Sequence, residues 1–178
     1  LGDALRELRQ RGASLPRKVS FLGKLAEVDG VPTAKYLKRL ETDIGDVEFV
    51  VESDLHYVQA VDYIRTHNGV VIIPSLLDNY PLTVIESITN GFCFVASSAG
   101  GIPEMIDQAV RFEPTASGLR QKLEDLHKVD FSTLKHPYEP AHARRVWLDH
   151  VQSVVDVRST PRRSRPKPAI QPVSVCIP

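Results

Sequence analysis

The stretch Pro74-Ser-Leu-Leu-Asp-Asn-Tyr-Pro-Leu-Thr-Val-Ile-Glu86 begins where an apolar run, Val70-Val-Ile-Ile73, stops at a proline. That run is too short for a helix, and its β-branched residues are typical of a buried parallel strand. A short polar loop follows it. Pro81 then suits the first position of a helix, because the N–H group that proline lacks has no partner there. The stretch therefore predicts a strand, a loop and the start of a helix.

A second unit of the same kind comes directly after the first. The expected helix ends at Gly91, and the residues that share its apolar face are Leu82, Ile85 and Ile88. A strand is expected over residues 92–96, followed by the pair Gly100-Gly101 and by Pro103 at another helix start. Two successive units indicate an α/β fold, a doubly wound parallel sheet of the Rossmann-like kind. Their loops leave the carboxyl ends of the strands, where open sheets of this kind bind ligands.

Two acids flank the first of these helix starts. Asp78 lies in the loop, and Glu86 lies in the second turn of the helix, with seven residues between them. A helix N-terminus presents free N–H groups and a partial positive charge, which suit a phosphate. The acids would then accept hydrogen bonds from hydroxyl groups on either side of it, as in a nucleotide sugar. For either acid alone, the alternative is a solvated loop residue or an exposed helix residue.

These residues together resemble the donor-binding signature of family 4 retaining glycosyltransferases, enzymes of the two-Rossmann-domain (GT-B) architecture. The family pattern is Pro-Ser, a Glu, seven residues, a second Glu, a strand and a Gly-Gly-x-Pro-Glu loop. The matching residues here are Pro74-Ser75, Glu86, Gly91, Gly100-Gly101 and Pro103-Glu104. The departures are Asp78, which stands where the family has its first Glu, and Asn79-Tyr80-Pro81 in place of a Gly-Phe-Gly-like step. The resemblance is strong over residues 70–112 and weak elsewhere.

The resemblance implies a role for each residue of the signature. Glu86 would hold the ribose of a nucleoside-diphosphate sugar, and Asp78 would hold the donor sugar. Backbone N–H groups at Leu82, Thr83, Gly100 and Gly101 would receive the phosphates, and the donor-binding set would also contain Lys24, Asn79 and Glu104. The family needs no metal and no cofactor, and it transfers the sugar with its anomeric configuration retained. Asp78 and Glu86 are thus the candidate catalytic residues.

The segment Lys18-Val-Ser-Phe-Leu-Gly23 reads as a strand that enters a glycine loop, with Lys24 at its carboxyl end. In the interpretation that we favour, it is the second strand of the nucleotide-binding domain, and the first strand lies upstream of Leu1. In the other, it is the first strand, and Lys24 replaces a family Arg. Asp29 then falls where the family has a Lys, and too few strands remain before Val70. Lys24 is otherwise an ordinary solvated lysine.

The composition excludes several classes of partner and site. The 178 residues include 22 basic and 22 acidic ones, so the net charge is zero and no nucleic-acid or anionic-membrane partner is indicated. The two cysteines, Cys93 and Cys176, form neither a disulfide framework nor a metal site, and a reduced cytoplasmic compartment is expected. No apolar run approaches the length of a transmembrane helix, and no signal peptide is present.

We divide the chain into a donor-binding domain over residues 1–156, a linker over 157–172 that is rich in proline and arginine, and a strand over 173–178. That strand resembles the opening strand of family 2 glycosyltransferases. The resemblance implies a fragment of a tandem glycosyltransferase, inactive alone, whose partners are a nucleotide sugar, an N-terminal acceptor domain and a downstream transferase domain. The alternatives are a nucleotide-sugar epimerase-like enzyme and a non-catalytic scaffold domain.

Overall fold

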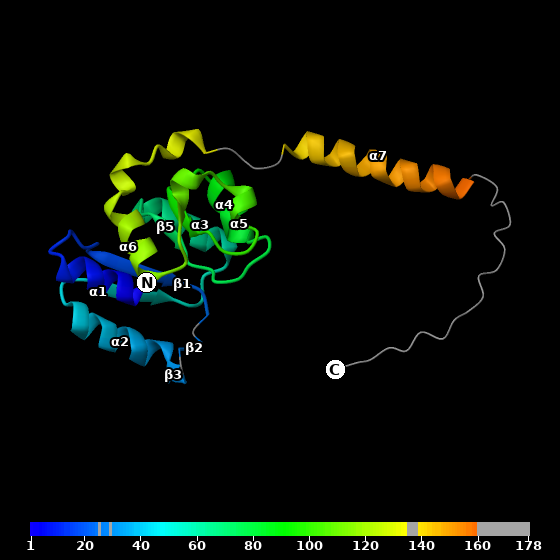
Figure 1. Ribbon diagram of the computed structural model, residues 1–178. Helices are drawn as coiled ribbons and strands as arrows, with labels where there is room; N and C mark the ends of the chain where they lie inside the picture. Colours follow the sequence, from blue (N-terminus) through cyan, green and yellow to red (C-terminus); the bar gives the residue numbers. More distant parts are fainter. Residues whose placement is uncertain (25, 29, 135–138, 160–178) are drawn as a thin grey trace, which may run out of the picture. The chain divides into compact units, whose positions relative to one another are not determined.

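The computed structural model describes residues 1–24, 26–28, 30–134 and 139–159. The strand predicted over 173–178 and most of the predicted linker lie outside the described residues. The chain divides into two compact units, Leu1–Pro137 and Tyr138–Pro178, and the elements of the candidate site all belong to the first (Figure 1). Within the described residues, no helix combines the length and the apolar composition that a membrane span requires.

The first unit contains two small parallel sheets. One holds β5 (Val71–Ile73), β6 (Phe94–Ser97) and β7 (Arg111–Phe112), with β6 in the centre. In the other, β1 (Lys18–Leu22) pairs with β4 (Glu48–Glu52). A two-stranded antiparallel hairpin of β2 (Glu27–Val28) and β3 (Val31–Pro32) precedes α2. The prediction of an α/β fold with parallel strands is therefore confirmed, and the structure is compatible with a Rossmann-like fold.

Helices cover both faces of the three-stranded sheet, as alternation along β6 shows. Phe94 and Ala96 pack with residues of α4 and α5, whereas Val95 points to the other face and packs with Ala4 and Leu119. α1 also packs with α2 against β1 and β4. The α-helices of this unit are α1 (Gly2–Gln10), α2 (Thr33–Ile44), α3 (Tyr57–His67), α4 (Leu82–Thr89), α5 (Ile102–Met105) and α6 (Ala116–Glu124). Short 3-10 turns cover Gln108–Val110, Leu126–Lys128 and Phe131–Thr133.

The helix that carries the candidate site is rotated from the orientation that its sequence suggests. Pro81 is the N-cap residue, so α4 begins one residue later than expected, at Leu82. Leu82 is 67% exposed, whereas Val84 is fully buried. The predicted face of Leu82, Ile85 and Ile88 is therefore wrong at its first position. The face that packs on the core instead contains Val84 and Ile88, four residues apart, which pack in the cluster that holds Ile73 and Phe94.

The turn after α4 also shifts the next strand. Gly91 adopts φ +67°, its N–H group donates to the carbonyl of Ile88, and the N–H group of Phe92 donates to that of Ser87. These are the two hydrogen bonds of a Schellman motif. Phe92 is thus held in the helix end, and β6 begins at Phe94 rather than at the predicted residue 92.

The second unit contains one described helix, α7 (Pro140–Ser159). The described side chains over 141–155 are exposed. Apart from Val146, the large apolar ones fall on one side of the helix at spacings of three and four residues: Trp147, Leu148, Val151, Val154 and Val155.

Candidate functional site

The loops that follow β5 and β6 form the candidate site, and two hydrogen bonds tie one loop to the other. The Ser97 hydroxyl, fully buried at the end of β6, donates to the backbone carbonyl of Ser75. The N–H group of Gly101 donates to the backbone carbonyl of Asp78 over 2.9 Å. The structure therefore brings the two halves of the predicted signature together at one edge of the sheet.

Gly100 and Gly101 allow the two loops to approach this closely. Gly100 has φ +58°, and a Cβ atom at this position would run into the backbone of Asp78. A Cβ atom at Gly101 would run into the carbonyl of Asn79. The glycine pair is thus required by backbone packing, whatever ligand binds there. The N–H group of Gly101 is already engaged, so in this conformation it is not available to a phosphate.

Asp78 is half-buried and shapes its own loop. Its Oδ1 atom accepts a hydrogen bond from the backbone N–H group of Tyr80 at 3.1 Å, the contact that defines an Asx turn. The carboxylate therefore has a structural function here, in addition to the contact with a donor sugar that the sequence predicts. Asn79 is exposed beside it.

The N-terminus of α4 offers free hydrogen-bond donors. Its N-cap residue is Pro81, which has no side-chain acceptor, and the first turn receives no side-chain cap. Val84 donates to the carbonyl of Pro81 at 3.1 Å, whereas the N–H groups of Leu82 and Thr83 have no hydrogen-bond partner within the described residues. These two groups lie at the positive end of the helix dipole and can receive an anion.

Glu86 lies on the same helix, one turn beyond these donors. It is half-buried, and over the described part of the chain its carboxylate makes neither an ion pair nor a hydrogen bond. A half-buried acid without a partner has unused acceptor capacity, which a ligand hydroxyl group can fill. The first turns of α4 thus present two hydrogen-bond donors, the backbone N–H groups of Leu82 and Thr83, and one acceptor, the carboxylate of Glu86.

The other predicted residues lie at the margin of this arrangement. Glu104 is exposed in α5, and its N–H group donates to the carbonyl of Gly101 at 3.1 Å. Lys24 follows β1 in the other sheet and is exposed, and none of its interactions within the described residues links it to the two loops. The structure thus joins Asp78, Asn79, Gly100 and Gly101 directly, and it leaves Lys24 separate.

One of the residues that tie the loops together was not identified from sequence. It is Ser97, whose hydroxyl is the fully buried link between β6 and the loop after β5. One signal for it exists in the sequence: a polar residue closes an otherwise apolar strand, Phe94–Ser97. A buried hydroxyl requires a hydrogen-bond partner, but the sequence does not show which one.

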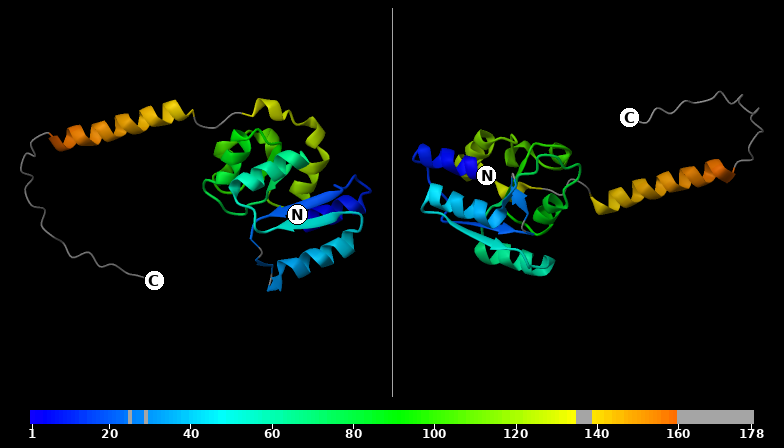
Figure 2. Two further views of the ribbon diagram at one scale, coloured as in Figure 1. Left: turned by 180° about the vertical axis from the view of Figure 1, so that it is seen from behind. Right: turned by 90° about the horizontal axis from the view of Figure 1, so that it is seen from below.

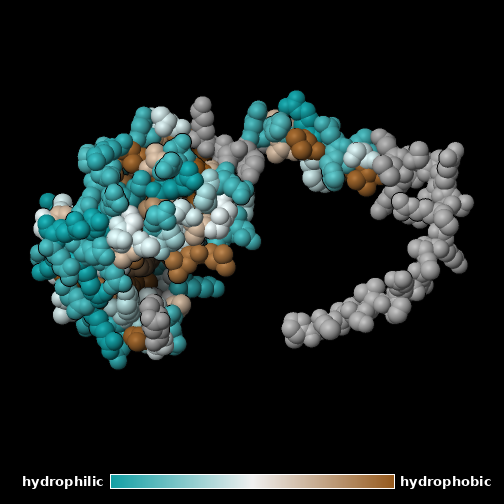
Figure 3. All heavy atoms as spheres, in the orientation of Figure 1, coloured by the Kyte–Doolittle hydropathy of each residue, from teal (hydrophilic) through white to brown (hydrophobic). Residues whose placement is uncertain are grey.

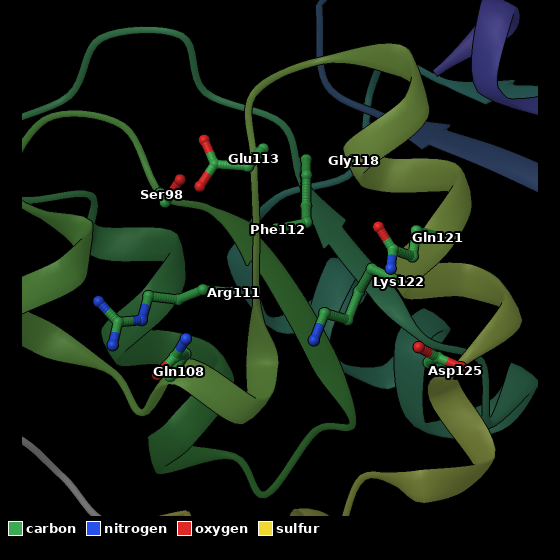
Figure 4. Close-up of a pocket in the computed structure, with 9 residues that line it drawn as sticks. All are labelled: Ser98, Gln108, Arg111, Phe112, Glu113, Gly118, Gln121, Lys122 and Asp125. Atoms are coloured by element: carbon green, nitrogen blue, oxygen red, sulfur yellow. The ribbon is translucent and has the colours of Figure 1, made fainter.

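A cleft of about 510 Å³ lies elsewhere, along β7 and α6. It contains Lys122 and Arg111, and among the residues that the structure describes the buried Nε atom of Arg111 has no hydrogen-bond partner. Figure 4 shows the Arg111 guanidinium pointing away from the Lys122 amine, and its Nη1 atom donates to the backbone carbonyl of Pro103 at 3.4 Å. Lys122 instead donates to the carbonyl of Ala109 at 2.9 Å. The two cations do not converge, so this cleft does not form a binding site for a single anion.

The described residues contain no group of three or more His, Cys, Asp or Glu side chains that could hold a metal ion. No known protein-family model and no curated protein sequence matches this chain. The functional interpretation therefore depends on the geometry of the two loops and of α4.

Proposed function

We propose that this chain binds a nucleoside-diphosphate sugar through the loops after β5 and β6, as the donor-binding half of a retaining glycosyltransferase. One observation supports the proposal above all others. The N–H groups of Leu82 and Thr83 and the half-buried carboxylate of Glu86 lie on one helix without partners within the described residues, next to two loops that hydrogen bonds from Ser97 and Gly101 link together. Open donors and an open acceptor at such an edge suit a diphosphate with flanking hydroxyl groups.

In this proposal each group has a defined task. The two N–H groups and the helix dipole stabilise the negative charge that develops on the departing diphosphate, which is commonly the largest electrostatic contribution to such a reaction. Glu86 accepts hydrogen bonds from the ribose hydroxyl groups, and Asp78 contacts the donor sugar. The architecture is GT-B, with the acceptor bound by an N-terminal domain and a transferase domain downstream. No metal takes part, and the compartment is the cytoplasm.

Calorimetric titration with UDP, GDP, ADP and dTDP tests the binding step. Glu86→Ala should weaken binding of the preferred nucleotide by more than about 1 kcal/mol, the usual scale for a hydrogen bond to a charged group. Glu41→Ala is the matched control, because Glu41 is an exposed acid on another helix, α2, and should leave binding unchanged. Equal affinity of wild type and Glu86→Ala would exclude Glu86 from the site.

A second function, a non-catalytic scaffold, is favoured by the contacts of two signature residues. The carboxylate of Asp78 accepts from Tyr80, and the N–H group of Gly101 donates to Asp78, so both already serve the loop itself. Nucleotide binding distinguishes the two functions, because a scaffold that holds a neighbouring domain needs no nucleotide. Absence of binding to any of the four diphosphates, in a protein that melts cooperatively, would favour the scaffold.

A further inference from the structure

The loop between β5 and α4 exposes four large apolar side chains to solvent. Leu77 and Leu76 are 84% and 77% exposed, more than any other large apolar residue that the structure describes, and Tyr80 and Leu82 are exposed as well. The three leucines belong to none of the hydrophobic clusters of the described chain. We refer to Leu76, Leu77, Tyr80 and Leu82 as the apolar rim. A single exposed apolar residue needs no explanation, but a group of them beside a candidate ligand site indicates an interaction surface.

Backbone hydrogen bonds keep the rim turned outward. The carbonyl groups of Ser75 and Asp78 both accept hydrogen bonds from the loop after β6. Leu76 and Leu77 lie between these two fixed points, and their side chains point to solvent. Figure 2 shows the green loops of the candidate site extending from the first unit in both views, and Figure 3 shows brown, apolar atoms at the surface where these loops lie in Figure 1. The contact that builds the candidate site therefore also fixes the exposure of the rim.

The rim borders the position that the proposed function assigns to the donor sugar, so what the rim binds is inferred on the basis of that function. Glu86 and the start of α4 hold the ribose and the diphosphate, and Asp78 holds the sugar. Leu77 directly precedes Asp78, and the N–H group of Tyr80 donates to the Asp78 carboxylate at 3.1 Å. Rim residues thus flank the sugar position on both sides in the chain. The molecule that meets the sugar there is the acceptor, whose hydroxyl group replaces the diphosphate.

The size of the rim and the charge around it restrict what can cover it. A stable protein–protein interface takes about 20–30 residues from each partner, whereas the rim has four side chains and is interrupted by the polar pair Asp78-Asn79. The acids of the candidate site, Asp78, Glu86 and Glu104, disfavour an anionic lipid surface, which attracts basic segments instead. A single hydrocarbon chain needs only a few apolar side chains and no charge, so it fits the rim best.

We propose that the apolar rim binds the hydrocarbon chain of an amphipathic acceptor, a lipid-linked alcohol or sugar, and that it selects such acceptors over water-soluble ones with the same head group. The acceptor oxygen forms a bond to the anomeric carbon of the donor sugar as the bond from that carbon to the diphosphate breaks. The diphosphate leaves with the bonding electrons and takes up the proton of the acceptor hydroxyl group. The rim contributes binding alone, so its residues determine specificity and take no part in the chemical step.

The test measures the binding of two alkyl glucosides to the whole chain of 178 residues. Octyl β-D-glucoside, kept below its micelle concentration, and methyl β-D-glucoside have the same head group and differ in the chain. With the preferred nucleoside diphosphate bound, octyl glucoside should bind at least about tenfold more tightly, because each buried methylene group adds to affinity. Amide chemical shifts, measured residue by residue, should move over residues 75–82 with octyl glucoside and not with methyl glucoside.

A double variant, Leu76→Ser with Leu77→Ser, shows whether the rim causes this difference. It should bind octyl glucoside at least about tenfold more weakly than the wild type does. The matched control is Val58→Ser, which replaces a 58% exposed valine of α3 and should leave the affinity for octyl glucoside unchanged. Both leucines are exposed, so the double variant is expected to fold. If it does not fold, the comparison of the two glucosides on the wild type still decides.

The outcomes distinguish failure at the rim from failure of the proposed function. If the wild type binds none of the four nucleoside diphosphates, the proposed function is overturned, and the assignment of the rim to an acceptor with it. If a nucleotide binds but the two glucosides bind equally, or if octyl glucoside shifts the amides of α7 instead of the loop, the assignment of the rim alone is overturned.

Two other occupants of the rim would also overturn the proposal. Cosedimentation of the wild type, but not of the double variant, with phosphatidylcholine vesicles would indicate that the rim enters a bilayer. A dimer of the wild type in light scattering that the double variant does not form would indicate a second copy of the chain.

Discussion

The two sheets of the first unit differ in how completely they are enclosed. In the three-stranded sheet, the central strand β6 is buried along its whole length and leads into one of the two loops of the candidate site. In the two-stranded sheet, β1 and β4 are half-buried, and their aromatic residues Phe21 and Phe49 stack with centroids 6.3 Å apart at the margin of the core. A strand with neighbours on both sides is shielded from solvent at both edges, so the candidate-site loop after β6 begins at a well-enclosed strand.

A matched pair of phenylalanine substitutions tests this difference most strongly. Phe94→Ala removes a fully buried ring from β6 and should lower the free energy of unfolding by about 3–5 kcal/mol. Phe49→Ala removes a half-buried ring from β4 and should cost about 1–2 kcal/mol, because less apolar area returns to water. Urea unfolding of the two variants provides the measurement. Equal losses would mean that the two-stranded sheet is enclosed as well as the other.

The next largest effect is expected where the loops of the enclosed sheet touch. Gly100→Ala combines a left-handed backbone with a clash against Asp78, and it should cost about 2–4 kcal/mol. Gly12→Ala is the control, since Gly12 has φ +66° with no atom within 4 Å of an added Cβ, and strain alone should cost about 1–2 kcal/mol. Thermal unfolding followed by circular dichroism compares them. If both variants lose the same stability, the contact between the loops contributes nothing.

The smallest effect concerns the buried hydroxyl that links β6 to the first loop. Ser97→Ala leaves the Ser75 carbonyl without this donor and should lower the free energy of unfolding by about 1–2 kcal/mol. Ser87 provides the comparison, because its buried hydroxyl donates at 2.7 Å to the Thr83 carbonyl within its own helix. That carbonyl keeps its place in the helix ladder, so Ser87→Ala should cost less than about 1 kcal/mol. A larger loss in Ser87→Ala than in Ser97→Ala would contradict this explanation.

The local sequence pattern was sufficient to predict the strands and helices around the candidate site. The run Val70–Ile73, the end of the helix at Gly91 and the pair Gly100-Gly101 predicted two strand–loop–helix units, and the structure contains both. These features depend on neighbouring residues alone: β-branched residues favour strands, and glycine adopts positive φ at little cost. The predicted ends of the helices and strands were less accurate. The Schellman turn after α4 moves the start of β6 to Phe94, and this turn depends on how the chain leaves the helix.

Tertiary packing decided the features that depend on more than one segment. The orientation of α4, which buries Val84 and exposes Leu82, follows from where the core lies. The engagement of the Gly101 N–H group by the Asp78 carbonyl follows from the contact of two loops that are separated in the chain. The Asp78 carboxylate, by contrast, is engaged by Tyr80 within its own loop. The sequence by itself determined which elements form, since propensity is local. Only the tertiary structure decided which polar groups remain open to a ligand, because hydrogen bonds between distant segments occupy some of them and leave the others.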